Sequence, residues 1–460
     1  LSIVSDTRGT TTDPVQKTME LLPLGPVVMM DTPGIDDAGD LGALRVKKSY
    51  QALNKTDLAV LVIDGTVGAL PQDAALLETI RRKALPWIVV LNKAELLSEE
   101  AREKTGKEVH TILYTHMHPD HRGGAGAFKD TAKEIIAFAP KTPILEHTGM
   151  LREVQMRRGA RQFGYELSDE ENISQGIGIR EGIAYGDKHA FVPANIVYES
   201  DWEGREIDGI RLELFRLPGE TDDQMAVWLP DTKVLCCGDN YYGCFPNLYA
   251  IRGSQYRDIA SWIRSIDRLR KFPAEYLLPG HTSVIYGREK IEEVLKSFQS
   301  AIEDILLRTL EGMNQGKTID ELASEIQLAP QYRDLPWLGE FYGCTEWTVR
   351  AIFTAYLGWF DGNPTHLHPL APKTHAERMR KLIGGRTALF EAIHQASEEQ
   401  DAQWCLELAE YWDENEEGAD EEQNRQVREC KIQALRQLAA FETSANGRHY
   451  YLVSAYELEK

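Results

Sequence analysis

The chain has 460 residues, of which 42% are hydrophobic and 27% charged, and its formal net charge at pH 7 is -21. This length allows two or three domains that each bury a core, and no apolar stretch reaches the roughly 18 residues that a transmembrane helix needs. The acidic balance, with no long run of Lys or Arg, argues against nucleic acid as a partner, because counterion release requires basic patches.

Three apolar, β-branched runs in the first hundred residues, at 27–31, 58–64 and 87–92, are separated by helix-length segments. This order predicts a βαβ arrangement of buried strands. The first run ends in Asp31-Thr-Pro-Gly34, and the third continues into Asn92-Lys-Ala-Glu95. In P-loop GTPases, motifs of these two kinds lie beside the γ-phosphate and read the guanine edge.

Residues 1–100 therefore resemble a P-loop GTPase, and the segments 5–15 and 31–37 resemble the FeFe-hydrogenase maturation GTPase in particular. The chain contains no GxxxxGKS/T loop, whose backbone amides and lysine supply most of the nucleotide affinity. We therefore expect residues 1–104 to form a GTPase-like fragment that does not bind GTP. The resemblance implies vestigial nucleotide-binding positions at Asp31, Gly34, Asn92, Lys93 and Glu95.

The chain begins at Leu1, with neither a start methionine nor the charged-then-apolar pattern of a signal peptide. We expect a cytoplasmic protein whose N-terminus is incomplete. The six cysteines show no CxxC spacing, which favours reduced, buried thiols over a disulfide framework.

Segment 115–121 places four metal-binding side chains within six positions. A short β-branched run precedes it and small residues follow it, so the ligands are expected at the carboxyl end of a strand. His116 and His118 can reach one ion, while Asp120 and His121 can reach a second. This mixture of nitrogen and oxygen donors suits zinc and is tolerable for iron or manganese.

This HxHxDH motif resembles the signature of the metallo-β-lactamase superfamily, which implies three further ligands in a fixed order. Glu220, Asp239 and His281 each follow a glycine and a strand-like run in that order. The resemblance implies a dinuclear zinc hydrolase in which Asp239 bridges the two ions and, with Asp120, is catalytic. It assigns one zinc to His116, His118 and Glu220, and the other to Asp120, His121 and His281.

A glutamate at position 220, where most of the superfamily carries histidine, is typical of the alkyl sulfatase branch. The stretches 157–161, 176–180, 245–253 and 356–364 are also similar to that branch, and the resemblance spans about residues 107–460. It implies cleavage of alkyl or aryl sulfate esters by a metal-bound hydroxide, with a small anionic ester as substrate. It also implies that Asn247 and Arg252 hold the sulfate, the guanidinium through two parallel hydrogen bonds.

The chain departs from this branch at Trp347, where a histidine is common, and it stops at Lys460, where many relatives continue into a sterol-carrier-like domain. The loss of a titratable group at Trp347 suggests a different leaving group or proton donor. Because the chain stops before such a domain, long-chain alkyl substrates are a weaker expectation. A metallohydrolase for another ester or a lactone is therefore an alternative. Further alternatives are a nucleotide-sensing switch, a metal-binding scaffold without turnover, and a non-functional chimera.

The hydrolase-like part also lacks several strands that normally precede HxHxDH. It could be a chimera of two incomplete proteins, or a fusion in which the βαβ layer replaces the missing half-sheet. We favour the chimera, because parallel GTPase strands do not match a mostly antiparallel half-sheet.

Between the motif and Glu220, the Gly- and Arg-rich insertion 146–202 lacks steady periodicity and predicts an ordered loop region over the pocket, or else a surface excursion. After His281 the pattern becomes helical. Short helices with small residues suit antiparallel pairs of the tetratricopeptide kind, as in the alkyl sulfatase dimerisation domain, and imply a homodimer. The expected helices cover 289–314, 345–357, 388–396, 402–412, 424–440 and 449–457.

The predicted fold class is α/β plus α. A GTPase-like βαβ fragment at 1–104 comes first. A metallo-β-lactamase αββα-type core with an incomplete N-terminal half follows at 105–287, and an all-helical dimerisation domain occupies 288–460.

Overall fold

The computed structural model divides into two compact units, Leu1–Val109 and His110–Lys460, which are described separately. It describes residues 108–142, 145–178, 190–416 and 420–460, of which all but 108 and 109 belong to the second unit. In the first unit it describes four strands and scattered positions between 52 and 83.

The first unit contains two strand pairs. Strands β1 (Val15–Leu21) and β2 (Gly25–Asp31) are antiparallel, whereas β3 (Ala59–Asp64) and β4 (Trp87–Asn92) are parallel. The parallel pair has the pairing that a βαβ unit requires. Strand β1 was not expected from the sequence. Asp31 and Asn92 end β2 and β4, while Gly34, Lys93 and Glu95 lie outside the described residues.

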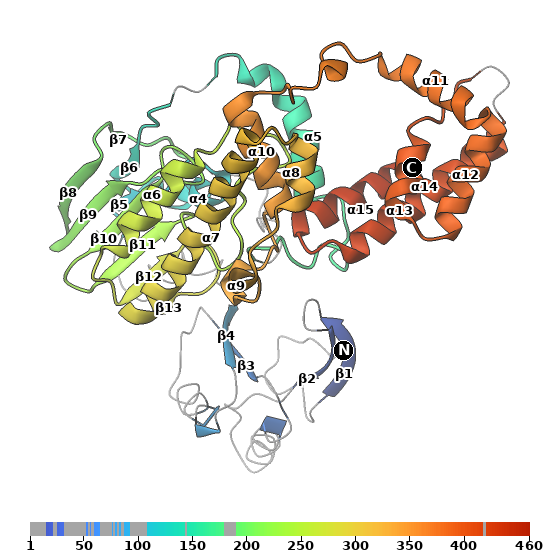
Figure 1. Ribbon diagram of the computed structural model, residues 1–460. Helices are drawn as coiled ribbons and strands as arrows, with labels where there is room; N and C mark the ends of the chain where they lie inside the picture. The colour runs from blue at the N-terminus through green and yellow to red at the C-terminus, as the bar shows by residue number, and fades with distance from the viewer. Residues whose placement is uncertain are drawn as a thin grey trace. The chain divides into compact units, whose positions relative to one another are not determined.

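The second unit is built around two sheets (Figure 1). The smaller sheet is parallel, in the order β5-β6-β7, and the larger has the order β13-β12-β11-β10-β9-β8. In the larger sheet only β11 and β12 pair in parallel. The strands are β5 (Thr111–Leu113), β6 (Glu134–Phe138), β7 (Ile196–Tyr198), β8 (Trp202–Ile207), β9 (Ile210–Arg216), β10 (Met225–Leu229), β11 (Val234–Gly238), β12 (Tyr276–Pro279) and β13 (Ile285–Tyr286).

The two sheets bury a shared apolar layer between them. Alternate residues of β9, Leu212 and Leu214, point into this layer, as the period of two in a strand requires. Met225 from β10 and Ile136 from β6 complete it, and both are fully buried. The sandwich therefore holds the ends of β5 close to the ends of the larger sheet.

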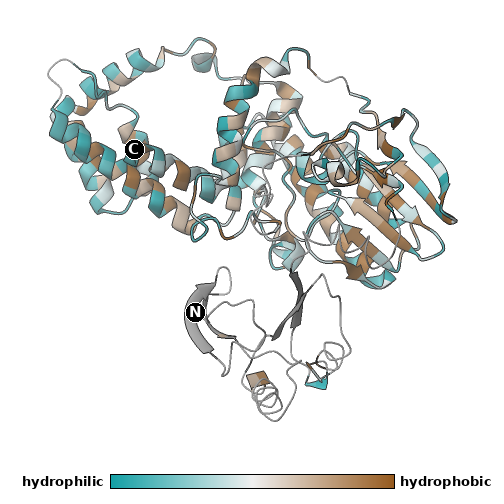
Figure 2. Cartoon of the chain, turned by 180° about the vertical axis from the view of Figure 1, so that it is seen from behind, coloured by the Kyte–Doolittle hydropathy of each residue, from teal (hydrophilic) through white to brown (hydrophobic). Residues whose placement is uncertain are grey.

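Helices cover the opposite face of the larger sheet. Helix α6 (Ile259–Arg270) begins at the Asp258 cap and buries Trp262, Ile266 and Leu269 on one face. The same core continues through α7 (Arg288–Asn314), α8 (Ile319–Glu325) and α10 (Thr345–Leu357). Figure 2 shows hydrophobic residues on the strands and on the helix faces turned toward them.

A second helical cluster ends the chain (Figure 1). Helices α12, α13 and α14 share a core that includes Leu389, Cys405 and Val427. The helices expected from periodicity are confirmed here, with ends that differ by a few residues. In this part of the chain α11 (Pro372–Ile383), α12 (Arg386–Glu398), α13 (Ala402–Ala409), α14 (Glu421–Phe441) and α15 (Ala445–Glu459) are observed. The short helix α9 (Pro330–Arg333) comes earlier, between α8 and α10, and its Tyr332 packs against the core of the larger sheet.

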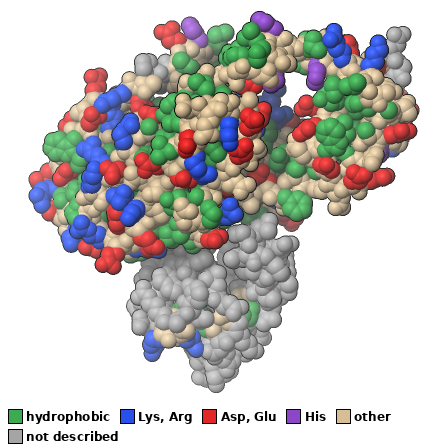
Figure 3. Space-filling view, viewed as in Figure 1, with side chains coloured by type: hydrophobic (Ala, Val, Ile, Leu, Met, Phe, Trp, Pro, Cys, Tyr) green, Lys and Arg blue, Asp and Glu red, His purple; other side chains and the backbone are tan. Residues whose placement is uncertain are grey.

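The expectation of a loop region for the whole insertion was wrong, because its first part is a helix, α5 (Arg152–Phe163). Gln162 is its one fully buried residue, so no apolar stripe reveals the helix in the sequence. Among the described residues, no helix is long and apolar enough to cross a membrane. Acidic and basic side chains alternate over the face shown in Figure 3.

Arg216, at the end of β9, connects the two sheets. Its buried guanidinium donates to the main-chain oxygens of Ala139, just after β6, and of Glu199, just after β7, each at 2.8 Å. It also contacts the Asp201 carboxylate at 2.9 Å. One side chain thus satisfies carbonyl groups that the small sheet leaves unpaired at its edge.

We expect Arg216→Met to lower the free energy of unfolding by about 2–4 kcal/mol, because two hydrogen bonds from a buried, charged guanidinium to part-buried main-chain carbonyls are lost. Urea unfolding followed by tryptophan fluorescence would measure this change. Arg211→Met is the matched control, since Arg211 is 63% exposed and pairs only with exposed Asp231. Equal midpoints for the two variants would contradict a bridging role for Arg216.

Candidate metal centre

The directions of the strands bring the predicted ligands to one edge of the sandwich. Strand β10 is antiparallel to both β9 and β11, so β9 and β11 run in the same direction, and β12 is parallel to β11. The segments that follow β9, β11 and β12 therefore leave the larger sheet at the same edge. They carry Glu220, Asp239 and His281, respectively.

The remaining ligands follow β5 in the smaller sheet. His116 lies in the turn after the strand, and His118 is the N-cap of the single-turn helix α4 (Pro119–Arg122). Asp120 and His121 lie within that turn. The helical geometry turns these two side chains toward the ends of β11 and β12.

A carboxylate pair and two imidazoles form one half of the site. The Nε2 atoms of His121 and His281 both lie 3.3 Å from Asp239 Oδ2. The same nitrogens lie 3.1 and 3.4 Å from Asp120 Oδ2, and 3.2 Å from each other. All four side chains therefore converge on a common point.

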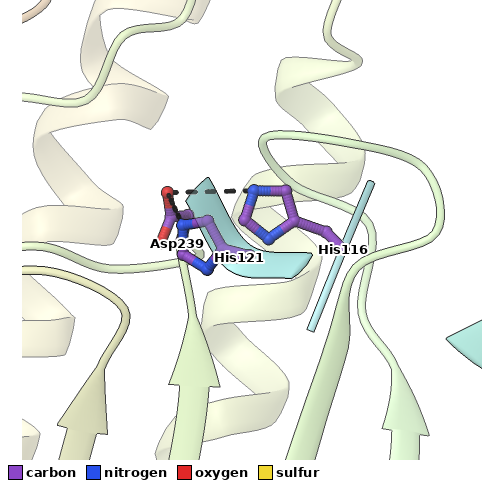
Figure 4. Close-up of side chains that lie close together, drawn as sticks. All are labelled: His116, His121 and Asp239. Carbon is purple, nitrogen blue, oxygen red and sulfur yellow. Dashed lines mark ion pairs between the residues drawn. The ribbon is translucent and has the colours of Figure 1, made fainter. Parts of the chain in front are cut away.

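The other half of the site joins this one through Asp239. His116 Nε2 lies 3.9 Å from Asp239 Oδ2, and His118 Nδ1 lies 4.0 Å from Glu220 Oε1. The two imidazole nitrogens are 3.0 Å apart. Figure 4 shows His116 and His121 turned toward the Asp239 carboxylate. Three sets of donor atoms lie within 4.8 Å of one another: His116, His121 and Asp239; His116, His118 and Glu220; and Asp120, His121 and His281.

Thr115 orients two of these imidazoles, a role that sequence reasoning missed. Its hydroxyl oxygen lies 3.1 Å from the Nδ1 atoms of both His116 and His121. Both rings therefore present Nε2 to the site, which is how outer hydrogen bonds orient metal-binding histidines. The carbonyl of Thr115 accepts from Met225 N at 2.6 Å, which fixes this residue against β10.

Gly280 is required by the closeness of the groups around it. A Cβ atom at this position would lie 2.0 Å from Asp239 Oδ1 and 2.8 Å from His121 Cε1. Both atoms belong to predicted ligands, so a Cβ here would displace them from the cluster. A glycine before His281 is therefore a steric condition for the cluster rather than only a turn former.

The donor set fits a divalent metal ion. Glu220 and Asp239 are buried, and one oxygen of each, Glu220 Oε2 and Asp239 Oδ1, has no hydrogen-bond partner. Burying an unsatisfied charged oxygen is costly, and coordination to a cation removes that cost. Imidazole and carboxylate together are donors that divalent transition metals prefer.

The pKa shifts of the histidines in this cluster also favour metal binding. Burial lowers the pKa of His116 to about 3 and that of His118 to about 2, so both rings stay neutral and keep a lone pair. Burial also disfavours the charged form of His121, but hydrogen bonds to Asp120 and Asp239 outweigh it and raise its pKa to about 10. A metal cation would replace the proton that His121 shares with these carboxylates.

Arg257 is a second residue that the sequence did not reveal. Its buried Nη1 donates to Glu220 Oε1 at 2.6 Å and also to the main-chain oxygen of Asn247. The guanidinium thus orients one predicted ligand and one predicted substrate contact. It stands just before the α6 cap and has no local motif that marks it.

The predicted substrate contacts lie beside this cluster. Asn247 is buried, and neither atom of its side-chain amide has a hydrogen-bond partner. Arg252 is partly buried, and among the described residues its guanidinium has no hydrogen bond or ion pair. Burial lowers the pKa of His118 most, and the charges of Arg257 and Arg252 lower that pKa further. Trp347 is partly buried in the first turn of α10.

Comparison with protein families matches three parts of the chain. Residues 59–281 match the metallo-β-lactamase superfamily, and residues 318–460 match the alkyl sulfatase dimerisation domain. Residues 1–93 match a 50S ribosome-binding GTPase family. The first hundred residues are thus GTPase-like. The more specific resemblance to the FeFe-hydrogenase maturation GTPase remains a prediction.

The chain is similar to a linear primary-alkylsulfatase of Pseudomonas sp., with 32% identity over 369 residues that cover 78% of this chain and 69% of the relative. It is 33% identical over 141 residues to the tRNA modification GTPase MnmE of Helicobacter pylori, covering 30% of each chain. The crystallised inverting sec-alkylsulfatase Pisa1 of Pseudomonas sp. has 25% identity and a TM-score of 0.70, covering 79% of this chain and 59% of that one. The chain spans 54% to 69% of the curated alkylsulfatases it matches.

We expect Arg257→Met to weaken metal binding by about 10- to 100-fold, because Glu220 would lose the group that orients it. Arg257→Lys, which keeps the charge, should lie between this variant and the wild type. Competition with a chelator measures the affinity, and circular dichroism verifies folding.

Arg264→Met on exposed α6 surface is the matched control and should bind metal like the wild type. Unchanged metal affinity in a folded Arg257→Met protein would show that Glu220 does not depend on Arg257.

Proposed function

The chain belongs to the alkyl sulfatase family of the metallo-β-lactamase superfamily, and from this membership we propose that it is a metal-dependent hydrolase of alkyl or aryl sulfate esters. The observation that carries the proposal is that candidate hydrogen-bond donors for an anion lie beside a cluster of candidate metal ligands. Asn247 and Arg252 offer donors without protein partners, and they adjoin carboxylates and imidazoles that converge on common points.

We propose that two zinc ions occupy the cluster. One would be held by His116, His118 and Glu220, and the other by Asp120, His121 and His281. Asp239 would lie between them, because its Oδ2 approaches imidazoles of both halves. Bound zinc would supply Lewis acidity and lower the pKa of a water molecule toward neutrality.

The residues of the chain would position the substrate for this chemistry. Hydrolysis adds one water across the ester, breaks either its C–O or its S–O bond, and yields an alcohol and hydrogen sulfate. Arg252 can present two parallel N–H donors to two sulfate oxygens, and the Asn247 amide can donate to a third. Asp120 and Asp239, which contact the imidazole of His121, are placed to accept the proton that the water loses.

The alkyl sulfatase dimerisation domain of the chain spans residues 318–460. We propose that the protein forms a homodimer through these helices. Analytical ultracentrifugation at micromolar protein concentrations tests this proposal. A protein that sediments as a monomer at every concentration tested would refute it.

We expect the purified protein to bind close to two zinc ions per chain. His118→Ala and Asp239→Asn should each lower this content, because the first removes a neutral donor and the second removes a charge. Elemental analysis of dialysed protein measures the content. His368→Ala, an exposed histidine in the segment before α11, is the control and should retain the wild-type content. Correctly folded wild-type protein without metal would exclude this assignment.

We expect Arg252→Lys to lower kcat/KM for an alkyl sulfate by roughly one to two decades while leaving the metal content unchanged. Lysine keeps the charge but loses the planar pair of donors, and a charge-assisted hydrogen bond contributes about 1.5–3 kcal/mol. Steady-state kinetics with octyl sulfate measures this loss.

A neutral ester or lactone serves as the control substrate, since it offers no anionic oxygens to the guanidinium. Its turnover should respond little to the same change. Equal losses for both substrates would indicate a metallohydrolase that acts on a different ester.

A further inference from the structure

The loop that carries Arg252 is held from outside by helix α5. This loop has no regular secondary structure, and it turns at Gly253, whose φ of +101° is unfavourable for other residues. Gly253 N donates to Ala250 O at 2.9 Å, which closes the turn around Arg252. Contacts with α5 therefore fix the position of the Arg252 main chain, from which the side chain extends.

Two residues of α5 bind the two ends of one peptide group. Arg158 Nη2 donates to the carbonyl oxygen of Ile251 at 2.6 Å. The main-chain N–H of Arg252 donates to Gln162 Oε1 at 2.8 Å. That carbonyl and that N–H belong to the same peptide bond, between Ile251 and Arg252. Because Arg158 and Gln162 are four positions apart, they lie on the same face of α5.

We propose that Arg158 and Gln162 are positioning residues that clamp the peptide before Arg252 and so aim its guanidinium at the sulfate group of the substrate. This inference rests on the proposed function. A peptide group is planar, so binding its oxygen and its nitrogen fixes the orientation of the whole plane. The N–Cα bond of Arg252 lies in that plane, so the clamp fixes the direction of the bond that leads to its side chain.

The clamp is itself anchored to the last helix of the chain. Arg161 pairs with Glu457 of α15 through two hydrogen bonds of 3.1 and 2.5 Å. His449 Nδ1, also on α15, lies 3.2 Å from the main-chain oxygen of Gln162. Asn172 Nδ2 donates at 2.9 Å to the carbonyls of Phe163 and Gly164, where α5 ends. Helix α5 is therefore fixed between α15 and the Arg252 loop.

This arrangement separates two functions of the site. The predicted metal ligands depend on the ends of the strands, whereas the sulfate contact depends on α5 and, through it, on α15. Loss of the clamp should therefore weaken the binding of sulfate without removing metal. A purely structural role for α5 would instead lower both together.

The test uses the full-length, metal-loaded protein with Arg158→Met, Gln162→Leu and Arg158→Lys. We expect the inhibition constant of inorganic sulfate and the KM for octyl sulfate to rise about five- to tenfold in the first two variants, with kcat changing less, because one hydrogen bond to the loop is lost. Zinc content should equal that of the wild type. Arg158→Lys keeps one donor for Ile251 and should recover part of the loss.

Arg157→Met is the matched control, because Arg157 precedes Arg158 on α5 but is exposed. It should match the wild type in every measurement. Wild-type values of KM and of the inhibition constant in both Arg158→Met and Gln162→Leu would overturn the clamp. Parallel loss of zinc in both variants would also overturn it, since α5 would then support the fold in general.

Hydrogen exchange distinguishes failure of the clamp from failure of the proposed function. Mass spectrometry of peptides that contain Arg252 should show faster exchange in Gln162→Leu than in Arg157→Met. A wild-type protein that does not turn over octyl sulfate refutes the proposed function, while this difference in exchange would still support the clamp. Equal exchange in the two variants would refute the clamp whatever the activity.

Discussion

The burial of carboxylates among imidazoles is the constraint on which the rest of this structure depends. Glu220 and Asp239 are excluded from water, and each keeps an oxygen without a hydrogen-bond partner. Such groups destabilise a fold unless positive charge compensates them. Arg257 compensates Glu220 at one oxygen, and the Nε2 atom of His121 lies 3.1 and 3.3 Å from carboxylate oxygens of Asp120 and Asp239. A divalent metal ion would complete this balance, because imidazole and carboxylate groups are suitable ligands for one.

The sandwich supplies these groups through the directions of its strands. Strands β9, β11 and β12 all end at one edge, and the end of β5 faces that edge across the apolar layer between the sheets. Arg216 holds the two sheets together beyond the ends of β6 and β7. Gly280 permits a side-chain approach that any Cβ would prevent. The ends of rigid strands thus hold the short segments that carry the candidate ligands close together.

The residues proposed to contact the substrate have a different structural basis. Asn247 and Arg252 lie in an irregular segment between β11 and α6. This segment forms no strand, so no strand pairing holds its main chain in place. Arg257 holds the carbonyl of Asn247, and α5 holds the peptide before Arg252. Helix α5 is fixed in turn by α15, in the region that matches the dimerisation domain. The C-terminal helical region is therefore connected through α5 to the loop that carries Arg252.

The sequence by itself predicted the βαβ order of the first hundred residues, the long helices after His281, and the candidate metal ligands that follow strands. His116 to His121 lie so close in the chain that local geometry brings them together, and Glu220, Asp239 and His281 each carry a short motif that their order makes specific. The long helices were predictable wherever one face is apolar, as in α7 and α10. Only the tertiary structure revealed α5, because this helix buries only Gln162 and leaves its Val154 and Met156 side chains exposed. It alone also revealed Arg257 and Gln162, which meet their partners 37 and 90 residues away, because contacts at such separations depend on how the elements pack and leave no local pattern in the chain.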